Sequence, residues 1–213
     1  MDTTVAKSLA ALMPILPVVG DDRPHLEDAI RAFKDHGGRF VLAGGLSMAG
    51  VQARRSLEAA KKVSAASESA WRKLYHWHAG GEPSYGAPRF YTVQLGRLVR
   101  ELCQKHGMND RIPRYIGRGV LAVNKYVAEK LFLKMYELEL EQQPSYRVWA
   151  YRKAAWSVDE LPQSLTDIYQ AHGIAGLMER SDIGRSIAEE IAAWVMAYIS
   201  VSYQTEVGLN GKT

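Results

Sequence analysis

Apolar residues recur at helical spacing along most of this chain, and proline or glycine stands at most places where the spacing stops. From Pro24 onward, Leu26, Ile30 and Phe33 lie three or four positions apart, and the run ends at Gly37-Gly38. Such spacing places apolar side chains on one face of a helix. Because similar runs fill most of the sequence, we expect an all-α protein, built as a multi-helix bundle.

Further helices are expected along the chain. A long helical pattern covers about residues 47–77, a second helix about 92–106, and others end at Leu140, include Tyr151, or run over about 185–203. Residues 79–88 form the clearest loop, because glycine and proline are concentrated there. The short apolar run 39–43 is either a strand or a buried connector. We divide the chain into an N-terminal helical region 1–85, a second region 86–203 and a polar tail 204–213.

Two motifs stand out in the C-terminal part. Trp149-Ala-Tyr-Arg-Lys-Ala-Ala155 leads through Leu161-Pro162 to Ser181-Asp-Ile-Gly-Arg-Ser-Ile-Ala-Glu-Glu-Ile191, and a helical stretch, Tyr126–Leu140, precedes them. Together they resemble the helix-hairpin-helix module at the N-terminus of family X DNA polymerases, the lyase domain of polymerase β and its bacterial relatives. In that family A-Y-R-[KR]-A-A leads through L-P to G-[IV]-G-x-[KG]-I-A-E-K-I. The resemblance covers about residues 119–200 and implies a DNA-associated module over 119–203.

The residue that carries the family's lyase chemistry is replaced in this chain. The resemblance places Glu190 where the family has the lysine that forms a Schiff base with an abasic sugar, and a carboxylate cannot form that imine. Ser186 stands at the hairpin's earlier lysine. Arg147 and Tyr151 match family positions, Arg147 as a basic residue near the DNA phosphate. The palm signatures G-S and D-x-D are also absent, so we expect no catalytic residue in the module.

Phosphate binding by such a hairpin depends on backbone N–H groups of its turn, presented at a helix N-terminus. Gly184 keeps the second glycine of the pattern, whereas Asp182 replaces the first. Aspartate tolerates left-handed backbone angles better than most residues, so we expect the turn to form, with the Asp182 side chain capping the next helix. Residues 137–213 carry six basic against eleven acidic residues, which disfavours phosphate binding by this part alone.

A weak internal repeat suggests tandem hairpins. Gln104-Lys-His-Gly-Met108 precedes Ile116-Gly-Arg-Gly-Val120, and Gln170-Ala-His-Gly-Ile174 precedes Ile183-Gly-Arg-Ser-Ile187. The alternative is coincidence, since glycine commonly ends helices.

Basic charge is concentrated ahead of the module. The windows 39–73 and 86–118 each contain seven Lys and Arg against two acidic residues, and Tyr91 and Tyr115 are interleaved with arginines in the second. Nucleic-acid binders place basic residues beside aromatic rings in this way, although a solvated helix face is the usual alternative. The candidate nucleic-acid contacts are Arg97, Arg100, Arg111, Arg114, Gly117, Arg118, Arg147, Tyr151, Gly184 and Arg185, and we expect the N-terminal two thirds to supply most of the affinity.

Other features indicate no cofactor, metal or membrane span. Cys103, the only cysteine, lies in a helical pattern where we expect it to be buried, and it is typical of a reducing cytoplasm. His76 and His78 lack further metal ligands nearby, and the glycine pairs around residues 37–45 fit no phosphate-loop pattern. Residues 9–19 are interpreted as a packed N-terminal segment, because two prolines interrupt the apolar run.

Three functions follow as alternatives. The first is a non-catalytic DNA-binding or DNA-repair accessory protein. The second is a protein-interaction or structural module that keeps the fold and recruits a protein partner through its acidic C-terminal face. The third is an enzyme, such as an atypical abasic-site lyase that uses Lys153 or Lys125.

Overall fold

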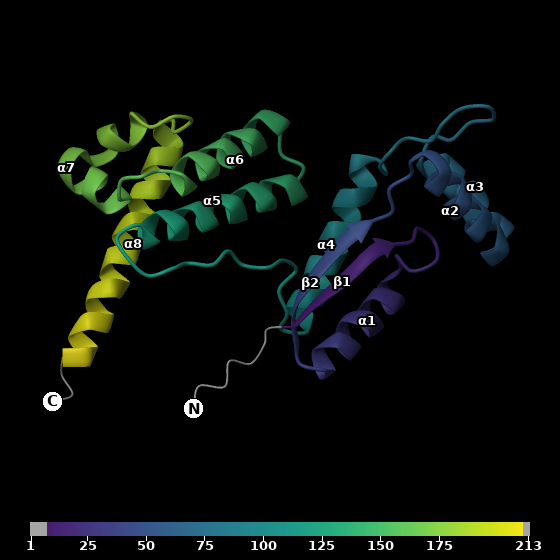
Figure 1. Cartoon of the computed structure of the whole chain (residues 1–213), viewed down its shortest axis with the longest axis horizontal. Helices are drawn as coiled ribbons and strands as arrows, with labels where there is room; N and C mark the ends of the chain where they lie inside the picture. Colours follow the sequence, from purple (N-terminus) through teal and green to yellow (C-terminus); the bar gives the residue numbers. More distant parts are fainter. Residues whose placement is uncertain (1–7, 211–213) are drawn as a thin grey trace. The chain divides into compact units, whose positions relative to one another are not determined.

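The computed structural model of this chain describes residues 8–210 and the side chains of residues 9–200. Within that range the chain forms eight helices and a two-stranded sheet (Figure 1). In chain order these are β1 (Ser8–Ile15), α1 (Arg23–Asp35), β2 (Gly38–Gly45), α2 (Gly50–Val63), α3 (Ala65–Leu74), α4 (Arg89–Lys105), α5 (Ala122–Leu140), α6 (Ser145–Asp159), α7 (Leu165–Met178) and α8 (Arg185–Asn210). The predicted, predominantly helical fold class is confirmed.

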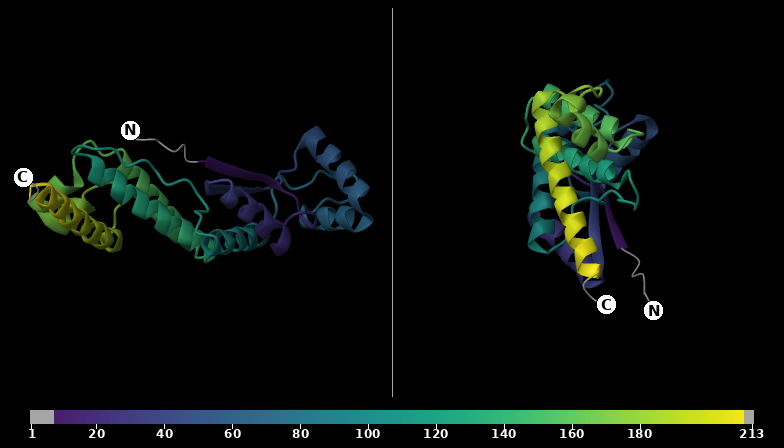
Figure 2. Two further views of the ribbon diagram at one scale, coloured as in Figure 1. Left: turned by 90° about the horizontal axis from the view of Figure 1, so that it is seen from below. Right: turned by 90° about the vertical axis from the view of Figure 1, so that its left-hand side faces the viewer.

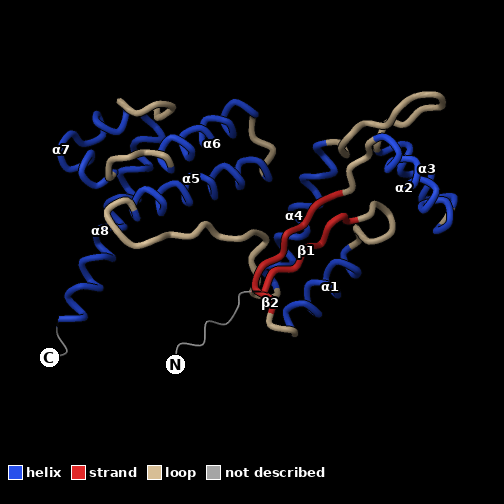
Figure 3. The backbone as a smooth tube through the Cα atoms, in the orientation of Figure 1, coloured by secondary structure: helices blue, strands red, loops and turns tan. Residues whose placement is uncertain are grey.

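The small sheet corrects the expectation that every element is helical. β1 and β2 pair in parallel, with Leu9 opposite Phe40 and Ala10 opposite Val41 (Figure 3). The run 39–43 is therefore a strand, and most of the segment expected only to pack at the N-terminus forms β1. Phe40 and Val41 are buried, as is common for β-branched and aromatic residues on a sheet that packs against helices.

α1 connects the two strands and has clear boundary signals. The Asp22 carboxylate accepts a hydrogen bond from the His25 N–H at 3.1 Å, which caps the helix start. Gly37, at φ 83°, supplies the left-handed backbone that turns the chain into β2. Between these ends, Leu26 and Ile30 are buried with Val41 and with the α4 residues Val99, Leu102, Cys103 and Leu95.

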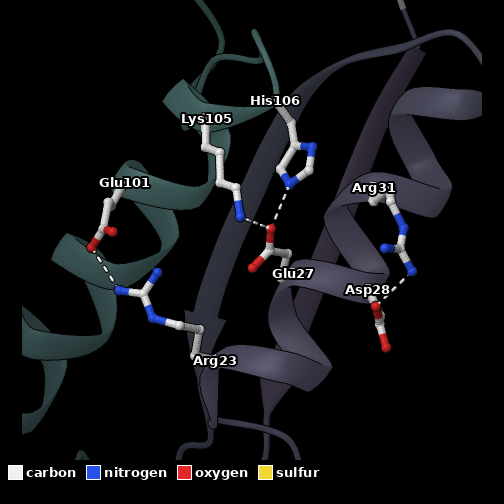
Figure 4. Close-up of polar contacts among 7 residues, drawn as sticks. All are labelled: Arg23, Glu27, Asp28, Arg31, Glu101, Lys105 and His106. Carbon is white, nitrogen blue, oxygen red and sulfur yellow. Dashed lines mark hydrogen bonds and ion pairs between the residues drawn. The ribbon is translucent and has the colours of Figure 1, made fainter.

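Ion pairs across the exposed side join α1 to α4. The Arg23 guanidinium lies 2.8 Å from the Glu101 carboxylate, and both Lys105 and His106 contact the Glu27 carboxylate (Figure 4). α4 thus belongs with α1 and the sheet. The chain accordingly divides into Met1–Ile112, the first unit, and Pro113–Thr213, the second unit, and this boundary falls after α4 rather than at residue 85.

The long helical pattern over residues 47–77 forms two helices instead of one. Ser64 has an extended backbone, and its hydroxyl accepts a hydrogen bond from the Ser67 N–H at 3.0 Å, so it caps the start of α3. α2 and α3 then pack together around Ala53, Leu57, Trp71 and Tyr75. A side-chain cap therefore overrides the continuous apolar spacing.

In the second unit, α5 and α6 lie side by side, as both Figure 1 and Figure 2 show, and α7 and α8 complete a four-helix core. The predicted core residues of this part are all buried in that core: Tyr151, Ala154, Ala155, Ile168, Ile183, Ile187 and Ile191. α8 continues to Asn210, so residues 204–210 are helical rather than a tail, and residues 211–213 lie outside the described range. No described helix has both the length and the apolar character that a membrane span requires.

The internal repeat does not produce two equivalent hairpins. Gly107 and Gly173 both have left-handed backbones, at φ 63° and 60°, so the first motif of each copy behaves alike. The chain then diverges, because Asn109 pairs with Phe40 of β2 whereas the helix resumes after Gly173. Gly117 lies in the non-helical segment between α4 and α5, which belong to different units. The only described connection that fits a short hairpin between packed helices of one unit at these motifs joins α7 to α8.

Candidate nucleic-acid interface

The α7–α8 connection is a six-residue turn that exposes the start of α8. Asp182 takes a left-handed backbone at φ 61°, as its sequence position predicts, and Ile183 anchors the turn in the core. The first hydrogen bond of α8 runs from the Ala188 N–H to the Gly184 carbonyl at 2.9 Å. The N–H groups that precede it have no intrahelical acceptor. A Cβ atom at Gly184 would meet no heavy atom within 4 Å, so the approach to these N–H groups is open.

Charges around this turn are largely balanced. Arg185 is exposed and pairs with Glu189 at 3.1 Å, and the Lys153 ammonium lies 3.9 Å from the Asp182 carboxylate. The described contact of the Asp182 side chain is thus with α6, rather than with the helix start that it was expected to cap. The turn offers backbone donors without a strong local excess of positive charge, so its electrostatic attraction for phosphate is weak.

Glu190, at the position of the family's nucleophile, is engaged with Tyr151. The Tyr151 hydroxyl donates a hydrogen bond to the Glu190 carboxylate. Burial of the ring, with this hydrogen bond as the second cause, raises the pKa of Tyr151 to about 12. Arg147 lies on the exposed side of α6 and donates to the Gln143 side chain at 3.3 Å. Of the two residues matched to the family, Arg147 is thus exposed, whereas Tyr151 is part of the core.

Arg114 is bound within the second unit. Its guanidinium pairs with the Asp159 carboxylate and lies 4.6 Å from the centre of the Phe132 ring. Lys125 contacts the same carboxylate at 2.9 Å. The predicted phosphate contact at Arg114 would therefore compete with a partly buried ion pair. Arg118, four residues further, is exposed in the segment that precedes α5, as is the nearby Tyr115.

The other predicted arginines lie in the first unit. Arg97 is exposed and Arg100 half-buried on α4, while Val99 and Cys103 point into the core. Arg97 and Arg100 are three positions apart and share one side of the helix, as predicted. Burial raises the pKa of the Cys103 thiol to about 12, so the expected buried cysteine is confirmed. Arg111 is half-buried and follows the short pairing at Asn109.

The net positive charge resides in the first unit. Residues 1–112 carry 16 Lys and Arg against 11 Asp and Glu, a balance of +5, whereas residues 113–213 carry 11 against 12, a balance of −1. Long-range attraction for phosphate therefore comes from the first unit. This charge distribution agrees with the expected placement of affinity for Arg97, Arg100 and Arg111, whereas Arg114 and Arg118 belong to the second unit.

Sequence reasoning missed a cavity in the first unit that brings together Lys73, His76, His78 and Phe90. The two histidines were placed on different faces of a helix, but α3 ends at Leu74, so that argument does not apply. No group of three His, Cys, Asp or Glu side chains that could hold a metal occurs among the described residues. The left-handed backbone at His76 has no simple sequence signal.

No family model matches this chain, and neither the curated proteins nor the solved structures include a significant match.

Proposed function

We propose that this protein is a non-catalytic, DNA-binding accessory protein whose second unit is a helix-hairpin-helix module. The observation that carries the proposal is the α7–α8 connection, with Asp182 in a left-handed conformation and an open approach to the first N–H groups of α8. Backbone donors at a helix N-terminus are a common means of binding phosphate. The resemblance to the family X module rests on the same residues, and a role in DNA repair would follow from it.

The distribution of charge supports a division of labour between the units. The first unit, with its balance of +5, would supply salt-dependent affinity through Arg97, Arg100 and Arg111. The second unit would fix the register of one phosphate at the α8 start. A buried cysteine and the lack of a described membrane-spanning helix are compatible with the cytoplasmic location that we propose.

The Tyr151–Glu190 contact supports the non-catalytic part of the proposal. A Schiff-base lyase needs an amine within reach of the abasic sugar, and the matched position instead holds a carboxylate bonded to a core tyrosine. The Lys125 amine, one alternative nucleophile, pairs with Asp159. The Lys153 amine, the other, lies near Asp182.

A second candidate function, protein recruitment, is favoured by the exposed face of α6. Tyr146, Trp149 and Trp156 all lie on that face with nearly half or more of their surface exposed, and the two indole rings are 6.3 Å apart. Exposed tryptophans with a neighbouring arginine, here Arg152, are typical of the central residues of protein interfaces. This face would add to, or replace, the acidic surface as the partner site.

Fluorescence anisotropy with labelled duplex and single-stranded DNA at about 50 and 200 mM salt tests the proposal, because phosphate binding weakens with salt. Arg97→Ala/Arg100→Ala should lower the slope of log affinity against log salt by roughly one per lost contact. Arg180→Ala/Arg185→Ala is the matched double variant in the second unit and should have the smaller effect. Loss of binding only in the second variant would refute the division of labour.

Wild-type protein that binds neither DNA with salt dependence would refute nucleic-acid binding itself. Protein recruitment would then be tested by affinity capture with wild type and with Trp149→Ala/Trp156→Ala, since a specific partner should be lost only in the variant.

A further inference from the structure

The end of α3 and the start of α4 enclose a cavity of about 520 Å³, within the ~300–1,000 Å³ range of ligand sites. Its apolar lining includes Leu74, Pro88 and Phe90, and its polar lining consists of Lys73, His76 and His78. Phe90 is 57% exposed although it is a large aromatic residue. The cavity thus combines a flat apolar surface with three nitrogen-bearing side chains.

The three polar side chains are available for a ligand. Lys73, His76 and His78 make no side-chain hydrogen bond or ion pair with any described residue, whereas neighbouring charges are paired. On the same helix pair, Glu58 contacts Lys61 and Glu68 contacts Arg72, both at 2.9 Å. An anionic group that enters the cavity would therefore meet donors without displacing an internal acidic partner.

The backbone at His76 is left-handed, at φ 51°, in a position where glycine is the usual residue. The helix end is a Schellman motif, because the Trp77 N–H donates to the Arg72 carbonyl at 2.8 Å and the His76 N–H donates to the Lys73 carbonyl at 3.3 Å. A non-glycine residue in this conformation is strained, and such strain is often found at functional sites. The histidine at this position lines the cavity, which gives the strained residue a use.

A second depression, of about 510 Å³, adjoins the first through His78 and has a similar chemistry. Its lining includes Arg54, Arg72 and Trp77. The Arg72 guanidinium lies 5.4 Å from the centre of the Trp77 ring, and the Trp77 indole N–H donates to the Gly81 carbonyl at 2.9 Å. Two adjacent hollows, each with one aromatic ring and with basic side chains, suit two successive units of one extended ligand.

We propose that these hollows bind unpaired nucleotides of a single strand, with a base against Phe90 and its phosphate at Lys73, His76 and His78. This inference rests on the proposed nucleic-acid binding and adds the form of nucleic acid that is recognised. Aromatic side chains stack on any base, and basic residues beside them hold the backbone. Bases within a duplex are already stacked and cannot enter a cavity without being extruded, so the site selects single-stranded nucleic acid.

The test measures the anisotropy of a labelled single-stranded oligonucleotide and of the blunt duplex of the same sequence. Wild type should bind the single strand more tightly. Lys73→Ala/Phe90→Ala should lose about tenfold or more of that affinity, since stacking of one base contributes ~1–3 kcal/mol. Lys62→Ala/Val63→Ala, which removes an exposed lysine and an exposed apolar residue away from the cavity, is the matched control and should lose about threefold at most.

Equal binding by the cavity variant and its control would overturn the inference while leaving nucleic-acid binding intact. Absence of any nucleic-acid binding by wild type would instead remove the proposed function and this inference with it. Tighter binding of a glutamate-rich peptide of equal charge than of the single strand would also overturn it, in favour of a protein ligand.

His76→Gly provides a variant that cannot lose binding through unfolding. Glycine relieves the left-handed strain, so the thermal midpoint should rise or stay unchanged. The affinity for the single strand should nevertheless fall about threefold, because one phosphate donor is lost. Unchanged affinity in a folded His76→Gly protein would exclude His76 from the site.

Discussion

Tyr151 of α6 donates its hydroxyl hydrogen bond to Glu190 of α8, across the core of the second unit. The tyrosine ring is buried among Ala154, Ile187 and their neighbours. Glu190 is half-buried, so its carboxylate keeps this bond in partial shelter from solvent. The residue that stands at the family's nucleophile position is therefore part of the helix packing.

Replacing Tyr151 with phenylalanine should destabilise the protein by about 1–2 kcal/mol, because a half-buried carboxylate loses a hydrogen-bond donor while the ring remains. The measurement is urea unfolding followed by circular dichroism. Tyr146→Phe, at an exposed position of the same helix, is the control and should change stability little. Equal effects of the two substitutions would mean that the Glu190 bond contributes nothing.

The protein should form no covalent adduct with an abasic-site oligonucleotide after borohydride reduction. An imine requires an amine, which Glu190 does not have. Glu190→Lys should restore little trapping, since Ser186 and Asp182 also depart from the family's pattern, and it should cost stability by placing a cation beside Tyr151. Efficient trapping by wild type would establish the atypical lyase and identify Lys153 or Lys125 for substitution.

Asn124→Ala should destabilise the second unit by about 3 kcal/mol, one of the larger effects of a single substitution. The Asn124 amide donates to the carbonyls of Leu161 and Gln163, at 3.1 and 2.9 Å, and its oxygen accepts from the Leu165 N–H at 2.9 Å. All three backbone groups would lose their partner. Comparison with the exposed Gln163→Ala, by thermal and urea unfolding, checks the prediction.

Stability should fall in acid partly through Glu27. Hydrogen bonds from Lys105, and secondly from His106, hold the pKa of this carboxyl below its ordinary value of 4.5. The folded state therefore binds the proton less readily than the unfolded state, so the contribution is complete above about pH 4.5 and is lost as the pH falls below it. Glu27→Gln should flatten this part of the pH–stability curve, measured by urea midpoints.

Asp28→Asn provides the control, since the Asp28–Arg31 pair is exposed on one helix and such pairs contribute little. A pH profile that is identical in wild type and Glu27→Gln would contradict the role given to Glu27.

The sequence by itself determined where most helices lie and which side chains fill the second core. Apolar spacing identified Tyr151, Ile168 and Ile191 as core residues, because one face of an amphipathic helix is buried whatever its partner is. Asp182 was likewise predictable as a left-handed residue, since its tolerance of that conformation is intrinsic to aspartate.

Only the tertiary structure decided which residues meet across the chain. The pairing of β1 with β2 depends on contacts between segments 30 residues apart in register, and the break at Ser64 depends on one side-chain cap. Arg114 was assigned to phosphate because its sequence neighbours are basic, yet Asp159, 45 residues away, binds it. The cavity at His76 arises where α3 ends and α4 begins, and local spacing carries no information about such distant juxtapositions.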